Sequence, residues 1–268
     1  MTKKALLIGI NYLDYGNASV PKLNGCVNDI VEVSKMLMDA YNYKREDIIM
    51  LRDDLDDATK KPTGENIVKA FNTLKNQSNA SDEIWIHFSG HGSFIQDTNN
   101  DERDGRDEII IPSDFHNGAI SDDYLFSVLN QLKCITFITM DCCHSGTICD
   151  LTYSFRNDVV RNGRTYYRRQ IEKRRRMRNR NIYMLSGSRD DQYAMDGYNY
   201  EKNIAMGAFT HVLTEGLRHF NHNVSMLQLH QSLTNTLKHY GFDQRCVLSS
   251  SNPYPFMRFT KHGIMRYH

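Results

Sequence analysis

The sequence predicts an α/β fold in which helices cover both faces of a mostly parallel central sheet. Short apolar runs alternate along the 268 residues with stretches of helical periodicity, and this alternation is typical of parallel sheets connected through helices. Most of the apolar runs are continuous, as expected for strands that are buried on both faces. Hydrophobic residues make up 40% and charged residues 24% of the chain, which excludes disordered, collagen-like and coiled-coil proteins.

Six apolar runs are predicted strands, and three sets of apolar residues between them predict helices. The first run lies close to the amino terminus, but it is too short for a signal-peptide core and lacks a small-residue cleavage site, so it is interpreted as a strand. The predicted strands are Ala5–Ile10, Ile48–Leu51, Ile84–Phe88, Ile135–Met140, Ile182–Leu185 and Tyr254–Phe259. Helical spacing is kept by Ile67, Val68, Phe71 and Leu74, by Leu125, Phe126, Leu129 and Leu132, and by Phe209, Val212, Leu213 and Leu217.

A strongly basic segment interrupts this pattern between residues 156 and 180. It contains eleven basic residues and two acidic ones, Asp158 and Glu172. Because such a block usually forms a solvated, mobile stretch, we expect a basic linker loop over 154–180. The basic residues are Arg156, Arg161, Arg164, Arg168, Arg169, Lys173, Arg174, Arg175, Arg176, Arg178 and Arg180.

Charge and cysteine usage exclude several classes of protein. The formal net charge is +1, so no molecule-wide field attracts nucleic acid or an anionic membrane. No apolar run reaches the ~18 residues of a membrane span. The six cysteines are scattered without a CxxC pair, which indicates neither a disulfide framework nor a zinc ribbon. We therefore expect a cytoplasmic monomer that binds neither membrane nor nucleic acid.

Two neighbouring strands end in residues that suit nucleophilic catalysis. Ser89-Gly90-His91-Gly92 follows one predicted strand, and Asp141-Cys142-Cys143-His144-Ser145-Gly146 follows the next. Sites of open α/β sheets lie at these carboxyl ends, and the glycines permit tight turns that expose a side chain. A cysteine nucleophile needs a histidine that takes its proton and later returns it. The alternative is a capped loop with a structural thiol, and spacing alone does not choose between the two cysteines.

These residues resemble a known family. The segments HFSGHG (87–92), DEIIIPSDF (107–115) and DCCHSG (141–146) resemble the catalytic core of metacaspases, which are caspase-related cysteine peptidases. SGSRDDQYA (186–194) and MGAFTHVL (206–213) resemble their small-subunit segment. The 52 residues that separate His91 from Cys143 also suit caspase-type chains, in which the histidine lies about 50 residues upstream. The resemblance implies a caspase-hemoglobinase fold in one peptidase domain, 1–268, with a large-subunit-like segment 1–153 and a small-subunit-like segment 181–268.

The resemblance also implies roles for individual residues. His91 is the expected general base and acid, Cys143 the nucleophile, and the N–H groups of Gly92 and Cys143 the oxyanion hole. It aligns four further residues with a pocket whose two carboxylates select Arg or Lys before the scissile bond. These are Cys26, Asp29, Ser89 and Asp141. The alternative for Asp29 is an exposed acid in the first turn of a helix beginning near Asn24, where it complements the helix dipole.

Four aspartates match the calcium-binding positions of calcium-dependent metacaspases, which implies Ca²⁺ as a cofactor. They are Asp107, Asp122, Asp123 and Asp150. Calcium prefers six to eight oxygen ligands, so carboxylates from several loops are suitable. The alternative is local, because Ser121 suits a helix N-cap and the two acids after it suit a first turn.

Together these observations predict a calcium-dependent cysteine endopeptidase that cuts protein or peptide substrates after Arg or Lys. If it does, the basic segment 156–180 is a tract of its own preferred sequence, and we expect self-cleavage there. The alternative is a catalytically silent caspase-like module whose basic segment holds an acidic partner or nucleic acid. Paracaspases and separases are the nearest enzymatic alternatives. The short linker favours the type I pattern, and because the sequence begins at its first strand, we expect this type I-like chain to lack a prodomain.

Overall fold

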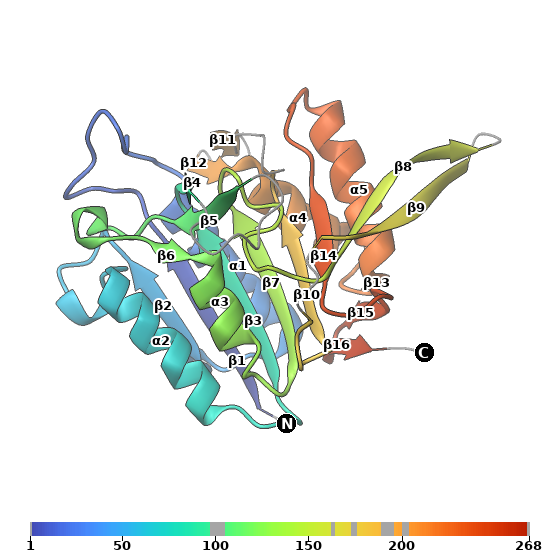
Figure 1. The fold of residues 1–268 in the computed structure, drawn as a ribbon, viewed down its shortest axis with the longest axis horizontal. Coiled ribbons are helices and arrows are strands. Elements are labelled where there is room, and N and C mark those ends of the chain that lie inside the picture. The colour runs from blue at the N-terminus through green and yellow to red at the C-terminus, as the bar shows by residue number, and fades with distance from the viewer. Residues whose placement is uncertain are drawn as a thin grey trace.

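A central sheet of eight strands organises the described part of the computed structural model, in the order β2-β1-β3-β7-β10-β14-β8-β9 (Figure 1). The structure describes residues 2–96, 105–161, 164–172, 176–188, 196–199 and 204–266. The first five strands of that order run parallel to one another. Each of the last three runs antiparallel to the strand before it in that order. In chain order they are β1 (Lys3–Gly9), β2 (Ile48–Arg52), β3 (Glu83–Ser89), β7 (Ile135–Asp141), β8 (Tyr153–Arg161), β9 (Arg164–Ile171), β10 (Ile182–Ser186) and β14 (Val247–Ser250).

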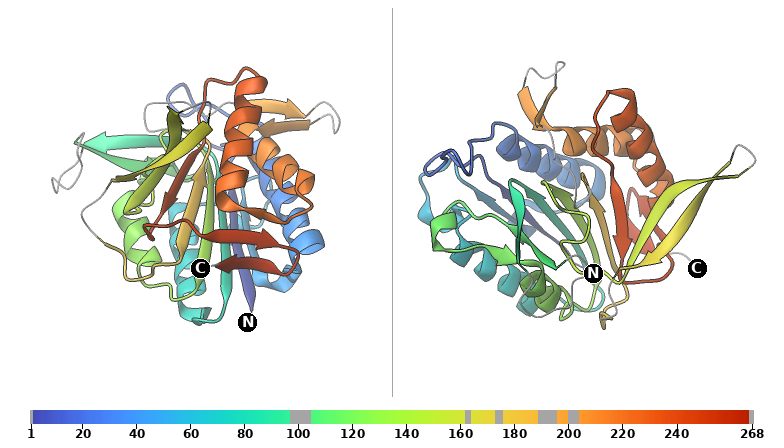
Figure 2. Two further views of the ribbon diagram at one scale, coloured as in Figure 1. Left: turned by 90° about the vertical axis from the view of Figure 1, so that its right-hand side faces the viewer. Right: turned by 45° about the horizontal axis from the view of Figure 1, so that its top comes forward.

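Helices cover both faces of this sheet, as the sequence predicts (Figures 1 and 2). Alternate residues of β1 show the two layers, because Leu6 and Ile8 pack with the helices of one face and Ala5 and Leu7 with those of the other. The first layer holds α2 (Gly64–Gln77) and α3 (Asp122–Leu129), and the second holds α1 (Cys26–Tyr41), α4 (Ala208–His219) and α5 (Met226–His239). No helix in the described part of the chain combines the length and apolarity that a membrane span needs.

Local chemistry explains where these helices begin. The Thr63 side chain accepts the N–H of Asn66 at the start of α2. Ser225 and Gln228 form a reciprocal capping box at the start of α5, which satisfies backbone donors that a helix leaves open at its first turn. The apolar residues of α2 that keep helical spacing, Ile67 and Phe71 among them, are buried against the sheet.

Short antiparallel sheets and 3₁₀ turns complete the fold. The described part has β4 (Gly92–Gln96), β5 (Arg106–Ile110) and β6 (Ile120–Ser121) in one such sheet, β11 (Asp196–Asn199) and β12 (Ile204–Gly207) in another, and β13 (Val224–Ser225), β15 (Met257–Thr260) and β16 (Gly263–Arg266) in a third. The 3₁₀ turns are η1 (Arg45–Asp47), η2 (Ala58–Lys60) and η3 (Phe115–Asn117).

The last predicted strand differs from the structure. Tyr254–Phe259 was expected in the central sheet, but the strand in this region begins at Met257 and belongs to the small sheet of β13, β15 and β16. Pro253 and Pro255 lack the N–H groups that a ladder needs, which disfavours a strand over that stretch. Residues Val247–Ser250 occupy the position beside β10 instead.

The basic segment also differs from expectation, because most of it is not a loop. Residues 153–161 and 164–171 form the antiparallel pair of β8 and β9, which extends the central sheet beyond β14 (Figures 1 and 2). A count of charges does not reveal these strands. The valine, threonine and tyrosine residues that stand among the arginines favour strand structure, but they do not enter such a count. Arg176, Arg178 and Arg180 lie in the irregular connection before β10, and Lys173, Arg174 and Arg175 lie outside the described residues.

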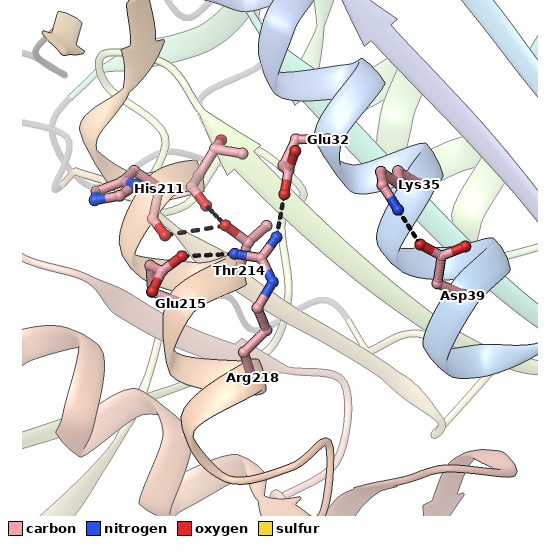
Figure 3. A network of polar contacts seen from close by, with 8 residues as sticks. Glu32, Lys35, Asp39, His211, Thr214, Glu215 and Arg218 are labelled. Atoms are coloured by element: carbon pink, nitrogen blue, oxygen red, sulfur yellow. Dashed lines mark hydrogen bonds and ion pairs between the residues drawn. The ribbon is translucent and has the colours of Figure 1, made fainter. Parts of the chain in front are cut away.

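An ion pair links α1 to α4 on one face of the sheet (Figure 3). Arg218 of α4 contacts the buried carboxylate of Glu32 in α1, and also pairs with Glu215 one turn earlier in its own helix. Nearer the start of α1, the Asn28 side chain donates to the carbonyl of Ala205, at 2.8 Å. The hydrogen bond holds the strand that precedes α4 against the start of α1, and the ion pair joins the end of α4 to the middle of α1.

Candidate active site

The two candidate catalytic turns leave the sheet side by side. Ser89 at the end of β3 is the register partner of Asp141 at the end of β7. His91 and Cys143 each follow two residues later. Because neighbouring strands lie about 4.8 Å apart, the paired ends start both turns from adjacent points on one edge of the sheet.

Gly92 lets these turns touch backbone to backbone. A Cβ atom at this position would lie 2.1 Å from the carbonyl oxygen of Cys143 and 3.3 Å from the Sγ of Cys142. The first distance is far inside van der Waals contact, so a side chain at residue 92 would push the two turns apart. The glycine after the histidine is therefore required by the close approach of the cysteine turn.

The imidazole of His91 is oriented by two groups that the sequence analysis did not identify. Its Nε2 lies 2.7 Å from the carbonyl oxygen of Pro21, and since a carbonyl only accepts, Nε2 carries the hydrogen and the Nδ1 of the neutral ring carries none. The backbone N–H of His91 donates to the hydroxyl of Tyr12, at 2.8 Å. That hydroxyl donates in turn to the carbonyl of Ile111, at 2.8 Å, and the two rings lie 4.7 Å apart.

The two adjacent cysteines lie in different environments. Cys142 is fully buried, and burial, followed by the charges of Cys143 and Asp141, raises the pKa of its thiol well above the ordinary value. Cys142 therefore stays a neutral thiol. Cys143 is only half-buried, and His144 after it adopts a left-handed backbone with φ of 51°, a costly conformation outside glycine that marks a sharp turn.

Two buried carboxylates converge beside this turn. Asp29 accepts the hydroxyl of Ser89 at 2.6 Å and the backbone N–H of Gly207 at 2.9 Å. Asp141 accepts the N–H and the hydroxyl of Thr210, at 2.8 and 2.7 Å. A Cβ atom on Gly207 would lie 2.2 Å from Asp141 and 2.8 Å from Asp29, so both carboxylates face one glycine.

Burial excludes one of the two interpretations of Asp29. It does lie in the first turn of α1, but it is fully buried and bonded to β3, which contradicts the exposed alternative. Cys26 begins the same helix, is buried, and donates its N–H to the side chain of Asn11 at 3.1 Å. Gly207 and Thr210 were not identified from the sequence as individual site residues, although the segment MGAFTHVL contains both.

Three of the four candidate calcium ligands are buried carboxylates in one region. Asp107 lies in β5, Asp122 begins α3, and Asp150 follows the cysteine turn. Burial, and next the charge of Asp107, raises the pKa of Asp122 to about 6. Burial raises the pKa of the Cys149 thiol, and the charges of Asp150 and Asp122 raise it further, so these charges lie near one another.

Several of these residues also serve local structure. Ser121 caps α3 by accepting the N–H of Tyr124, at 3.3 Å. Asp122 accepts the N–H groups of Glu108 and Asp123, at 3.1 and 2.7 Å, and Asp123 itself is half-buried. Within the described residues no group of three or more His, Cys, Asp or Glu side chains is arranged to hold a metal ion. The oxygen donors thus suit calcium chemically, but they do not form a closed coordination shell.

Comparison with known proteins decides the family. The family model for the metacaspase peptidase C14 domain matches residues 3–152, which include both catalytic turns. The chain belongs to the metacaspase family. Metacaspase-1 of Candida glabrata is 32% identical to this metacaspase over 94% of the chain and 73% of that relative. Metacaspase-1 of Pyricularia oryzae is 42% identical over 59% of the chain, and the matched region spans 40% of that relative's length.

Solved structures show the same fold. Caspase-1 of Spodoptera frugiperda matches this metacaspase with a TM-score of 0.54 at 12% identity, over 93% of this chain and 86% of the caspase. A protein of Geobacter sulfurreducens matches with a TM-score of 0.65 at 21% identity, over 94% of both chains. The predicted caspase-like α/β fold is confirmed.

Proposed function

We propose that this metacaspase is a cysteine endopeptidase that uses Cys143 and His91. The observation that carries the proposal is the pairing of Ser89 with Asp141, which starts both catalytic turns from adjacent strand ends. Cys143 is the accessible thiol of its pair. The Nε2 of His91 donates its hydrogen to the carbonyl of Pro21, so Nδ1 is the ring atom that accepts a proton.

The reaction follows from these atoms. The Cys143 thiol gives its proton to His91, and the thiolate attacks the carbonyl carbon of the scissile peptide bond. The N–H groups of Gly92 and Cys143 stabilise the oxyanion that forms. As the C–N bond breaks, His91 returns the proton to the leaving amine, and water then hydrolyses the thioester and regenerates the thiol.

The proposed substrate carries Arg or Lys before the scissile bond. Asp29 and Asp141 are buried acceptors that converge on Gly207, and a guanidinium or ammonium group would form charge-assisted hydrogen bonds with such a pair. An aspartate there would face two carboxylates of its own sign. We expect cleavage after Arg or Lys to be at least ~100-fold more efficient than cleavage after Asp, because the mismatch costs several kcal/mol.

The proposed cofactor is Ca²⁺, held by Asp107, Asp122, Asp123 and Asp150. Support comes from the burial of three of these carboxylates and from the pKa of Asp122, which burial raises to about 6 and to which the charge of Asp107 adds a smaller upward shift. A divalent cation would remove this repulsion. Asp150 lies seven residues after Cys143 and has a left-handed backbone with φ of 50°, so the ion would stabilise the segment that follows the nucleophile.

Self-cleavage is proposed at the connection between β9 and β10. Peptidases cut exposed, irregular chain in preference to hydrogen-bonded strands. The ladder of β8 and β9 therefore protects Arg156, Arg168 and Arg169. Arg176, Arg178 and Arg180 are exposed and lie outside any strand, which makes them the described candidates for the cut.

One assay tests the activity, the selectivity and the cofactor. Fluorogenic peptides that end in Arg, Lys or Asp are incubated with the protein in calcium or in chelator. Hydrolysis of the Arg and Lys peptides in calcium alone is the expected result. Asp29→Asn and Asp141→Asn should narrow the preference for Arg over Asp, whereas Asp39→Asn, which changes an exposed acid on α1, should leave it unchanged. Efficient hydrolysis of the Asp peptide, or full activity in chelator, would contradict the corresponding assignment.

A further inference from the structure

A cavity of about 640 Å³ lies between the hairpin β8–β9, α5 and the beginning of β14. None of the catalytic residues or the paired carboxylates proposed above lines it. Its volume is within the range of known ligand sites, which is about 300–1,000 Å³. The cavity is therefore large enough to hold a ligand away from the proposed active site.

The helix α5 turns a polar face toward this cavity. Leu229, Leu233 and Leu237 point into the core, as an amphipathic helix requires. A second stripe, at positions i, i+3, i+4 and i+7, lines the cavity instead, and it consists of Gln231, Thr234, Asn235 and Lys238. Facing elements normally pack through apolar side chains, so amide, hydroxyl and ammonium groups on this face indicate a polar ligand.

Hydrogen bonds link the walls of the cavity to one another. Tyr167 of β9 donates its hydroxyl to the carbonyl of Leu227, at 2.9 Å, and lies 2.8 Å from Nδ1 of His230. The Nε2 of His230 lies 3.0 Å from the carbonyl of Cys246, just before β14. Asn157, at the irregularity in β8, donates to Gln231 at 3.2 Å. A preformed site of this kind loses little conformational entropy when a ligand binds.

The charges around the cavity define the ligand. Arg156, Lys238 and Arg245 line it, and Arg156 and Lys238 form no ion pair within the described part of the chain. Arg156 is also the register partner of Arg168, and like charges at opposite positions repel unless an anion lies nearby. Glu172 and Asp243 line the cavity as well, but Glu172 already accepts hydrogen bonds from Ser154 and Gln170.

We propose that this cavity binds an acidic polypeptide segment. Side-chain carboxylates of the segment would pair with Arg156 and Lys238, and its backbone would bond to the amide groups of the α5 stripe. A nucleic acid fits less well, because Arg156 and Lys238 are two separate cations, whereas binding a nucleic acid requires cations along a run of closely spaced phosphates. Gly146 and Thr147 also line the cavity, so a protein held there lies near the turn of Cys143, three residues upstream. The binding itself does not depend on peptidase activity.

Direct binding to the full Cys143→Ala protein tests the proposal independently of catalysis. The probe is a fluorescein-labelled decapeptide of alternating glutamate, serine and glycine, and the matched probe carries glutamine at each glutamate. Fluorescence anisotropy should show at least ~10-fold tighter binding of the glutamate probe at low salt, with a large loss at 0.5 M salt because screening weakens ion pairs. Arg156→Gln and Lys238→Gln should each weaken it by about three- to tenfold. Lys69→Gln, which changes an exposed cation on α2, is the control and should change nothing.

Hydrogen exchange gives a second, independent readout. Binding of the glutamate probe should protect amides of residues 226–239 and 153–157, where the cavity walls lie. Equal binding of the two probes, an equal loss in Lys69→Gln, or tighter binding of a single-stranded DNA decamer than of the glutamate probe would each overturn the proposal. Protection confined to other elements would overturn the location.

Discussion

The two neighbouring cysteines differ in burial, and this difference predicts which of them is the nucleophile. We expect Cys143→Ala to abolish peptide hydrolysis, because it removes the half-buried thiol beside the His91 turn. Cys142→Ala should keep substantial activity, since that thiol is buried and its pKa is raised well above the ordinary value. Steady-state hydrolysis of an Arg peptide by both variants gives the comparison. Full activity in the Cys143→Ala protein would show that the nucleophile is misassigned.

The close approach of Gly92 to the backbone of Cys143 leads to a second prediction about a single residue. We expect Gly92→Ala to lower kcat by at least ~100-fold, because a displacement of about 1 Å between catalytic groups has effects of that size. The added Cβ would lie 2.1 Å from the Cys143 carbonyl oxygen. Gly64→Ala is the matched control, since the nearest atom to its added Cβ lies at an ordinary 3.7 Å. Unchanged hydrolysis by Gly92→Ala would show that the turns tolerate separation.

Motifs in the sequence identify side chains better than they identify backbone groups. His91, Cys143 and Asp141 lie in recognisable segments at the ends of strands, and Asp29 lies in a recognisable segment at the start of α1. The carbonyl of Pro21 carries no sequence signature, because every residue has one, and only the fold brings it to 2.7 Å from His91. Gly207 and Thr210 were missed for a related reason, since their contacts with Asp29 and Asp141 join residues far apart in sequence.

At the scale of elements, two buried histidines predict how stability depends on pH. His87 in β3 contacts the hydroxyl of Thr139, at 2.8 Å, and His230 lies in α5. Burial lowers the pKa of His87 to about 3 and that of His230 to about 4. The unfolded chain therefore binds protons that the folded chain excludes as the pH falls below about 6.5. Their contribution to stability is complete above that pH and decreases progressively down to about pH 4 for His230 and about pH 3 for His87.

Urea unfolding in chelator between pH 7.5 and 5 measures this effect. The free energy of unfolding should fall with decreasing pH, by up to ~1.4 kcal/mol per pH unit for each histidine. Asp122, whose pKa is raised to about 6, acts in the opposite sense and reduces the net slope. His230→Asn should reduce the slope of the unfolding free energy against pH by the amount that one proton contributes. His116→Asn changes an exposed residue and should leave that slope unchanged. An unaltered slope in His230→Asn would contradict the buried, neutral state.

Elements were predicted well where periodicity and burial agree. The five parallel strands follow from continuous apolar runs, and α2, α3 and α4 follow from helical spacing. The helix α5 was not predicted. The hairpin of β8 and β9 was missed because its arginines dominate a charge count, although a strand at the edge of a sheet commonly carries charged residues. Edge strands bury few side chains, so their sequence pattern is weaker than that of β3 or β7.

At the scale of the whole molecule, the fold predicts that the two fragments of a self-cleaved chain stay associated and keep peptidase activity. A cut near Arg176 to Arg180 divides the 31.1 kDa chain into fragments of about 20 kDa and about 11 kDa, at an irregular segment that peptidases reach. His91 and Cys143 remain in the first fragment, and Thr210, which holds Asp141, in the second. The parallel pairing of β7 with β10 and the Glu32–Arg218 ion pair join the two.

The experiment incubates the purified protein with calcium or chelator and maps new termini by mass spectrometry. We expect calcium-dependent cuts after Arg176, Arg178, Arg180 or the adjoining basic residues, and fragments that elute together from gel filtration with activity retained. Glutamine at positions 176, 178 and 180 should reduce cutting without reducing hydrolysis of an Arg peptide, because the cut lies outside the site. Arg168→Gln, inside the ladder of β8 and β9, should be cut like the parent. Termini within that ladder would contradict the protection argued from the hairpin, and processing of the Cys143→Ala protein would reveal a contaminating peptidase.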